Sequence, residues 1–387
     1  ATGTLVGITA SASDADATTN TVTYSLTNNA GGRFQIDSAT GVVTVLNGAL
    51  IDYESASSHN ITVRADSADG SFSTQIYTVN VNNVNDAPAN VVPGPQTVAE
   101  DTALAIAGVS VTDVDGNLST TQLTVGNGTV TVSLAGGATI SAGANGTGTL
   151  TLAGTQAQIN AALATISYQG NLNFTGADTL TVTSTDSNAV VDTDTVALTV
   201  TSVNDAPANV VPGPQTVAED TALSIAGVSV TDVDGNLATT QLTVGNGTVT
   251  VSLAGGATIS AGANGTGTLT LAGTQAQINA ALATISYQGN LNFTGADTLT
   301  VTSTDSNAVA DTDTVAITVT SVNDAPANVV PGPQTVAEDT ALAIAGVSVT
   351  DVDGNLATTQ LTVGNGTVTV SLAGGATISA GRTGRGR

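Results

Sequence analysis

The stretch Val84-Asn85-Asp86-Ala87-Pro88 returns as Val203-Asn204-Asp205-Ala206-Pro207 and again as Val322-Asn323-Asp324-Ala325-Pro326. Each copy follows an alternation of apolar residues that is typical of a β-strand. Its Asn and Asp supply hard oxygen donors, and its Pro fixes the backbone φ angle. We therefore interpret the stretch as a junction between successive β-domains.

Internal repetition sets the domain organisation. Residues 85–203 and 204–322 align without a gap at a period of 119 residues, and a third copy runs from Asn323 to Gly381. Repeats of this kind indicate duplicated structural units. The predicted units are a domain lacking its first strand at residues 1–86, repeats at 87–205 and 206–324, a truncated repeat at 325–381, and a tail at 382–387. A one-base deletion would convert the expected Ala-Asn-Gly-Thr-Gly-Thr into Arg-Thr-Gly-Arg-Gly-Arg, so we expect the tail to be a frameshift product.

Period-two alternation dominates each repeat and predicts an all-β fold of tandem Greek-key sandwiches arranged end to end. The predicted inward stripe of one strand, for example, is Val130, Val132 and Leu134. One segment differs, because Thr155 and Gln158 have capping-box spacing and Ile159 and Leu163 lie four residues apart. We predict a short helix over residues 156–164 that covers part of the sandwich core.

Composition excludes several classes of function. The chain has 30 acidic and 5 basic residues, with a net charge of −25, so no basic patch exists for nucleic acid. It has no Cys, which rules out metal sites with thiolate ligands. It has a single His, so the identical repeats cannot each contain a catalytic nucleophile paired with a His base. No apolar run approaches the ~20 residues that span a bilayer. We expect a non-enzymatic protein that binds no nucleic acid and has no membrane-spanning segment.

A second acidic element follows every junction at the same distance: Asp113-Val114-Asp115-Gly116, Asp232-Val233-Asp234-Gly235 and Asp351-Val352-Asp353-Gly354. Two like charges ~5 Å apart repel by roughly 3 kcal/mol at an effective dielectric constant of about 20. Several carboxylates that converge on a junction would therefore need a cation. We predict that Ca²⁺ is held between consecutive domains; the simpler alternative is an Asp-Gly turn.

The first domain resembles a cadherin repeat. The motifs that carry this resemblance occur in order along the domain: Asp14-Ala15-Asp16, Thr23-Tyr24-Ser25-Leu26, Phe34-Gln35-Ile36-Asp37, Thr40-Gly41-Val42-Val43, Ile51-Asp52-Tyr53-Glu54 and Ala65-Asp66-Ser67-Ala68-Asp69-Gly70. The resemblance implies calcium ligation between domains by an Asp-x-Asp motif, an Asp-Arg-Glu-like motif, a Glu near the domain start and an Asp-x-Asn-Asp-Asn linker.

The resemblance also implies a ligand set. The linker here departs from the family pattern at Asn83 and Ala87, so we expect weak binding, with a Kd on the order of 10⁻⁴ to 10⁻³ M. The candidate ligands in the first domain and its linker are Asp14, Asp16, Asp52, Glu54, Asp66, Asp69, Asn85 and Asp86. Those in the repeats are Glu100, Asp113, Asp115, Asp186, Asn204, Asp205, Glu219, Asp232, Asp234, Asp305, Asn323, Asp324, Glu338, Asp351 and Asp353.

The later repeats resemble the cadherin-like repeats of large bacterial surface adhesins. The motifs that carry this are Ala99-Glu100-Asp101-Thr102, Asp113-Val114-Asp115-Gly116, Gly154-Thr155-Gln156 and Phe174-Thr175-Gly176-Ala177-Asp178-Thr179-Leu180. The resemblance implies that the Greek-key sandwiches are of the cadherin or immunoglobulin-like class. It also implies an extracellular adhesion stalk on a bacterial cell surface, stiffened by calcium. Two alternatives stay open: the repeats themselves bind a partner, either a second copy, another surface protein or a glycan, or they form a passive spacer.

Overall fold

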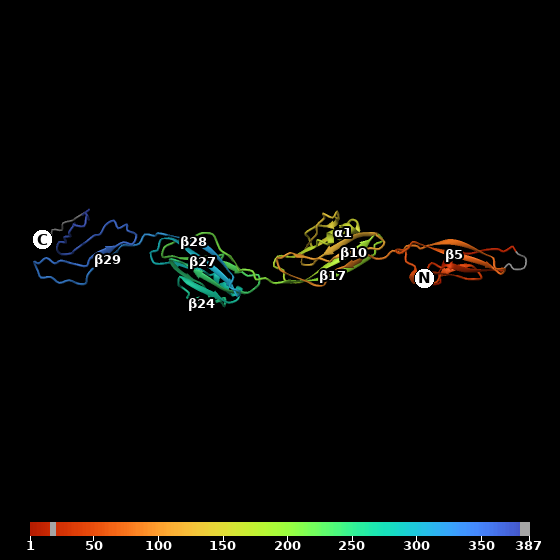
Figure 1. Ribbon diagram of the computed structural model, residues 1–387. Helices are drawn as coiled ribbons and strands as arrows, with labels where there is room; N and C mark the ends of the chain where they lie inside the picture. Colours follow the sequence, from red (N-terminus) through yellow and green to blue (C-terminus); the bar gives the residue numbers. More distant parts are fainter. Residues whose placement is uncertain (16–20, 380–387) are drawn as a thin grey trace. The chain divides into compact units, whose positions relative to one another are not determined.

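The computed structural model describes residues 1–15 and 21–379. The chain divides into two compact units, Ala1–Val203 and Asn204–Arg387, which are described separately. The prediction of an all-β chain of sandwich domains is confirmed in both units (Figure 1).

The first domain packs two three-stranded sheets against each other. One sheet has the order β1-β4-β3 and the other β2-β5-β6. Phe34, Val43, Ile61 and Val63 form the centre of the core between them. The element bounds are β1 (Leu5–Thr9), β2 (Val22–Asn28), β3 (Phe34–Ile36), β4 (Val42–Val45), the 3₁₀ helix η1 (Gly48–Leu50), β5 (Ser58–Ser67) and β6 (Phe72–Asn80).

The second domain is a larger sandwich with a six-stranded sheet in the order β13-β14-β11-β16-β17-β8. Strands β12, β15 and β9 form a second sheet, and β10 pairs with β7. The bounds are β7 (Ala89–Val91), β8 (Gln96–Ala99), β9 (Leu104–Ala105), β10 (Ser110–Thr112), β11 (Leu118–Thr124), β12 (Gly128–Thr131), β13 (Thr139–Gly143), β14 (Thr149–Ala153), α1 (Gln156–Leu163), β15 (Ser167–Gly170), β16 (Gly176–Asp186) and β17 (Val191–Thr201).

The alternating apolar residues of this domain point into one core. Leu150, Leu152, Leu180 and Val182 are fully buried, as their spacing predicts. Leu134 is the exception: β12 ends at Thr131, and the chain then turns, with Gly137 N donating to Leu134 O. The predicted stripe therefore ends at Val132, and Leu134 is exposed.

Helix α1 follows the sequence prediction closely. The Thr155 hydroxyl accepts from Gln158 N, and the Gln158 side chain accepts from Thr155 N, which completes the capping box. Ile159 and Leu163 are buried in the sandwich core. The Asn160 side chain bonds both the N–H and the C=O of Val111, at 2.8 Å each, so the helix is fixed beside β10 (Figure 1).

The third domain, in the second unit, repeats this architecture, and its six-stranded sheet has the order β19-β28-β27-β22-β25-β24. The bounds are β18 (Ala208–Val210), β19 (Gln215–Ala218), β20 (Ala222–Ser224), β21 (Ser229–Thr231), β22 (Leu237–Thr243), β23 (Gly247–Thr250), β24 (Thr258–Gly262), β25 (Thr268–Ala272), α2 (Gln275–Leu282), β26 (Ser286–Gly289), β27 (Gly295–Asp305) and β28 (Ala310–Thr320). After it, the described residues to 379 form only β29 (Ala327–Val329) and β30 (Ser348–Thr350). The predicted frameshift tail lies outside the described residues.

Candidate metal centres at the domain junctions

At the first junction, Asp115 holds the linker to the second domain. Its Oδ2 accepts from Asp86 N at 2.6 Å, and its Oδ1 accepts from Asn83 Nδ2 at 2.8 Å. Asp113 to Gly116 form a turn, closed by Gly116 N donating to Asp113 O, with Gly116 at φ +69°. Glycine favours this left-handed conformation, so the Asp-Gly turn presents the Asp115 side chain to the linker.

The turn is anchored to helix α1. Gln156 Oε1 accepts from Asp113 N at 2.9 Å, next to the bonds that Asn160 makes to Val111. Helix α1, which was predicted from the sequence to cover the core, therefore also positions the Asp113–Gly116 turn.

Asn85 and Asp186 connect the linker to the C-terminal end of β16. Asn85 Nδ2 donates to Asp186 Oδ2 at 2.6 Å, and Asn85 Oδ1 accepts from Asn117 Nδ2 at 2.6 Å. Asp186 is buried and also accepts from the N–H groups of Asn188 and Val190. The hydrogen bond from Asn85 is the main cause that lowers the pKa of Asp186 below its usual range.

The first domain adds carboxylates to the same junction. Glu54 is exposed, but partial loss of hydration raises its pKa, and the negative charges of Asp115, Asp52 and Asp86 raise it further. Asp115 has a lowered pKa, chiefly because of the Asp86 backbone bond, and it also shares a hydrogen bond with Glu54. Asp115 therefore favours its charged form, while the raised pKa of Glu54 favours its protonated form. Asp52, Glu54, Asp86 and Asp115 thus come together, as the junction prediction requires.

The corresponding junction of the second unit has a more complete set of possible metal ligands than the first junction. Glu219, Asp324 and Asp353 each offer one carboxylate oxygen, and these oxygens lie within 4.8 Å of one another. Backbone contacts fix two of them, because Val322 N donates to Glu219 Oε1 at 2.7 Å and Asp324 N to Asp353 Oδ2 at 2.6 Å.

Two carboxylate oxygens at this junction are buried and lack a hydrogen-bond partner among the described residues: Oδ2 of Asp324 and Oδ2 of Asp351. Burial raises the pKa of Asp324, with further contributions from the charges of Asp353, Glu219, Asp220 and Asp351. Buried carboxylate oxygens are normally paired or bound to metal. The arrangement therefore has the chemistry of a cation site.

A cavity of about 420 Å³ lies beside these groups. Asp324, Asp351 and Thr350 line it together with Asn292, whose backbone N–H donates to Asp220 Oδ1 at 3.0 Å. Asp220 was not among the candidate ligands predicted from the sequence. The repeated Glu-Asp-Thr motif was the available signal, because it places Asp220 directly after Glu219.

The remaining candidate ligands of the repeats bond within the unit to which they belong. In the first unit, Glu100 is buried and its Oε1 accepts from Val203 N at 2.7 Å. In the second unit, Asp205 N donates to Asp234 Oδ2 at 2.7 Å, and Asn204 Nδ2 donates to Asp305 Oδ2 at 2.6 Å. Asp232 Oδ1 accepts from Asn236 N, and Asn323 Oδ1 accepts from Asn355 Nδ2. Glu338 is exposed.

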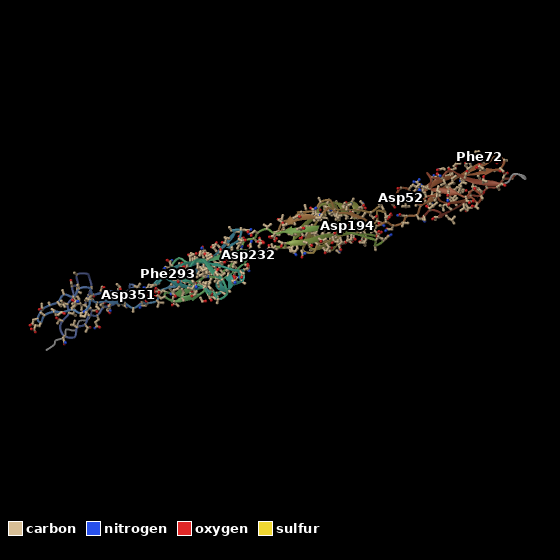
Figure 2. The ribbon with its side chains drawn as sticks, turned by 90° about the horizontal axis from the view of Figure 1, so that it is seen from below. Asp52, Phe72, Asp194, Asp232, Phe293 and Asp351 are labelled. Atoms are coloured by element: carbon tan, nitrogen blue, oxygen red, sulfur yellow. The ribbon has the colours of Figure 1, made fainter. Side chains whose placement is uncertain are left out.

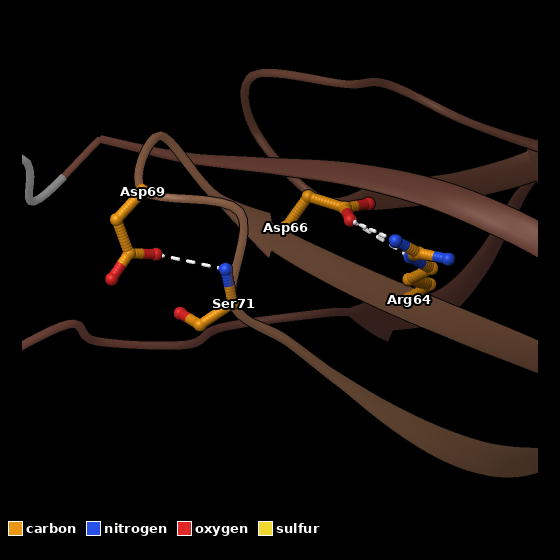
Figure 3. Close-up of polar contacts among 4 residues, drawn as sticks. All are labelled: Arg64, Asp66, Asp69 and Ser71. Carbon is orange, nitrogen blue, oxygen red and sulfur yellow. Dashed lines mark hydrogen bonds and ion pairs between the residues drawn. The ribbon is translucent and has the colours of Figure 1, made fainter.

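Three first-domain candidates lie away from the Asp86 junction. Asp66 pairs with Arg64, which also stacks on Phe72, and Asp69 accepts from Ser71 N at 2.8 Å (Figure 3). Asp14 accepts from the Ser67 hydroxyl, near the same loop. Figure 2 shows Phe72 and Asp52 at opposite ends of the domain, so these residues do not join the Asp52–Glu54 cluster. Asp16 lies outside the described residues.

Asp178 has a structural role instead. Its carboxylate accepts from Gly126 N, Asn127 N and the Tyr168 hydroxyl, all at 2.9 to 3.0 Å. These bonds close the β11–β12 connection over the core.

A model of the cadherin domain matches residues 1–82. Residues 1–82 are a cadherin domain. The prediction from the ordered motifs of this segment is confirmed, and its Asp52 and Glu54 lie beside the linker as the family pattern implies.

Other comparisons concern the repeats and the whole chain. A model described as the protein GAMETE EXPRESSED 2 domain matches residues 109–195 and 227–314. Solved structures that are similar to this chain include mouse cadherin-23 EC22-24, at 19% identity and TM-score 0.41, covering 83% of this chain and 93% of that one. Protocadherin gammaB7 EC3-6 gives 18% identity and TM-score 0.45, covering 91% and 80%. Protocadherin gamma B2 domains 1-5 give 18% identity and TM-score 0.40, covering 79% of this chain and 54% of that one. No curated protein matches the chain.

Within the described residues, no helix has the length and hydrophobicity that crossing a bilayer requires. The resemblance of the later repeats to bacterial adhesins stays a prediction.

Proposed function

We propose that this chain is part of an extracellular adhesion stalk whose β-domains bind calcium at their junctions. The cadherin domain at residues 1–82 supports the extracellular setting. The role is mechanical rather than catalytic, and the partners of the stalk are other cell-surface proteins or glycans. A bacterial cell surface is the location that the sequence resemblance favours.

The cluster of Glu219, Asp324 and Asp353 is the observation that carries this proposal. The donors are all oxygens, which suits a hard cation such as Ca²⁺. The buried Oδ2 atoms of Asp324 and Asp351 supply the two unfilled acceptors that such an ion would satisfy. The residues present therefore fit the ion.

Backbone groups of the chain hold the carboxylates of this cluster in position. Backbone N–H groups of Val322 and Asp324 hold the carboxylates of Glu219 and Asp353 in place. Calcium, when bound, supplies the positive charge that offsets repulsion among these carboxylates. With that repulsion removed, the linker has one preferred geometry instead of many, and consecutive domains behave as a stiffer array.

Small-angle scattering tests the stiffening. We expect calcium on the order of 10 mM, above the expected Kd, to increase the maximum dimension of the chain. The distribution of interatomic distances should also be narrower than in excess chelator. A variant with Glu219→Gln, Asp324→Asn and Asp353→Asn should respond less, because one junction no longer binds the ion. An identical distribution with calcium and with chelator in the wild-type chain would refute the proposed role.

A further inference from the structure

In both complete repeats, the last strand pairs in parallel with a strand near the start of the domain. Strand β8 pairs with β17 in the second domain, and β19 pairs with β28 in the third. The neighbouring pairs β16–β17 and β27–β28 are antiparallel. Strands β17 and β28 are the last of their domains, so the chain leaves each domain through a strand that is bonded to an early one.

Parallel pairing decides how tension along the chain acts on these strands. The chain enters β8 at its N-terminal end and leaves β17 at its C-terminal end, so tension pulls the two strands in opposite directions along their length. The residue pairs of this ladder, from Gln96 with Leu198 to Ala99 with Thr201, are then loaded together. In a hairpin that is pulled at its open end, by contrast, the pairs separate one after another. Removal of β8 from β17 therefore requires several hydrogen bonds to break in one step.

Side-chain and backbone bonds extend this ladder beyond the end of β8. The Thr201 hydroxyl donates to Val98 O at 3.3 Å, and Glu100 N donates to Thr201 O at 2.9 Å. Glu100 Oε1 accepts from Val203 N at 2.7 Å, and the Glu100 residue is only 5% exposed. A hydrogen bond to a charged group is stronger than one between neutral groups, and burial strengthens it further. Glu100 therefore joins the end of β8 to the first residue of the linker.

The third domain repeats each of these contacts. The Thr320 hydroxyl donates to Val217 O at 3.3 Å, and Glu219 N donates to Thr320 O at 2.8 Å. Glu219 Oε1 accepts from Val322 N at 2.7 Å, and Glu219 is also 5% exposed. The same arrangement thus occurs once in each unit, in two domains of nearly identical sequence.

We propose that β8 with β17, and β19 with β28, are force-bearing clamps that resist unfolding when the chain is pulled from its ends. Glu100 and Glu219 are the load-bearing side chains at the end of each clamp. The bonds of each clamp join groups of the chain itself, so the clamp acts without calcium. Its use in a stalk rests on the proposed function, whereas its strength is a property of the fold.

Single-molecule force spectroscopy of the full chain, tethered through its two termini in excess chelator, tests the clamp. Each complete repeat has a period of 119 residues and should unfold in one step that releases up to about 400 Å of chain. The two wild-type repeats should unfold at the same rate at constant force, because their clamps are the same. In Glu100→Ala, the second domain should unfold roughly 10-fold faster, and the third domain in the same molecule serves as its control. Because chelator removes calcium, failure of the clamp and failure of calcium binding give different results.

Three further variants separate load bearing from general stability. Glu100→Gln keeps an acceptor for Val203 N and should unfold within about twofold of the wild-type rate under load. Val130→Ala should lower the free energy of unfolding in urea, because Val130 is fully buried. Its rate under load should stay within about twofold of wild type, because β12 lies in the other sheet and outside the clamp. Thr201→Val, at an exposed position, should unfold about 5-fold faster under load.

Two results would overturn the proposal. One is a Glu100→Ala repeat that unfolds at the wild-type rate under load, and the other is a Val130→Ala repeat that accelerates as much as Glu100→Ala does. A step of full length in the same recording shows that the altered repeat is folded. If Glu100→Ala gives no such step, Thr201→Val decides, and an unchanged rate in that variant overturns the proposal.

Discussion

The Asn85 amide donates a 2.6 Å hydrogen bond to Oδ2 of Asp186, a residue 101 positions later in the chain. The same Asn85 side chain accepts from Asn117, so a single linker residue connects two distant segments of the second domain. The linker is therefore built into the domain that follows it.

Replacing Asn85 tests this connection. Asn85→Ala should lower the unfolding temperature of the second domain by several degrees, because Asp186 and Asn117 lose a half-buried hydrogen-bond partner. Asn188→Ala provides the matched comparison, since the Asn188 side chain is exposed and it is the Asn188 backbone N–H that donates to Asp186. Differential scanning calorimetry should show a smaller effect for Asn188→Ala. Equal effects would contradict the role given to Asp186.

The Asn160 side chain tests how the helix supports the junction. Asn160→Ala removes two bonds to the Val111 backbone and should reduce the free energy of unfolding of the second domain by about 1–3 kcal/mol. Ala161→Ser, next to it, should change that free energy by less than about 1 kcal/mol. Urea denaturation measures both, and a null effect of Asn160→Ala would show that the helix is held by its apolar face alone.

Calcium binding should be coupled to the loss of a proton from the Asp324 carboxyl group. Its pKa is raised in the folded chain, so the folded state holds this proton at pH values where the unfolded state has lost it. In the absence of calcium, stability therefore falls as pH rises from the ordinary carboxyl pKa through the raised one. Calcium needs the carboxylate, so binding should release protons and weaken as pH is lowered into this window.

Calorimetric titration in two buffers with different ionisation enthalpies measures that release. We expect more protons released per calcium at about pH 5 than at about pH 7.5. The variant Asp324→Asn should release fewer protons at the lower pH. Proton release that is the same at both pH values would contradict the linkage.

The sequence predictions that depend on local patterns were the most accurate. The alternation in β14 and β16, and the Thr155–Gln158 capping box, depend on neighbouring residues and were predicted correctly. Leu134 was misplaced, because the turn that ends β12 is not visible in the apolar pattern alone.

Long-range geometry could not be read from the sequence. The repeated motifs indicated that Asp86 and Asp115 belong together, and they do. The distance between Asp66 and Asp52 could not be predicted: Asp66 pairs with Phe72 across β5 and β6, and Phe72 lies toward the opposite end of the domain from Asp52. The spacing of Glu219 and Asp220 did not reveal that the charge of Asp220 raises the pKa of Asp324.

Calcium titration of the wild-type chain and of the variant Glu219→Gln/Asp324→Asn/Asp353→Asn tests the central claim most directly. Asp37→Asn serves as the control, because Asp37 accepts hydrogen bonds within a turn of the first domain and is not one of the candidate ligands. The wild-type and control chains should bind calcium with a Kd on the order of 10⁻⁴ to 10⁻³ M, and the triple variant should bind fewer ions per chain. No heat of binding from the wild-type chain, or the same stoichiometry in the triple variant, would contradict the claim that these carboxylates hold the ion.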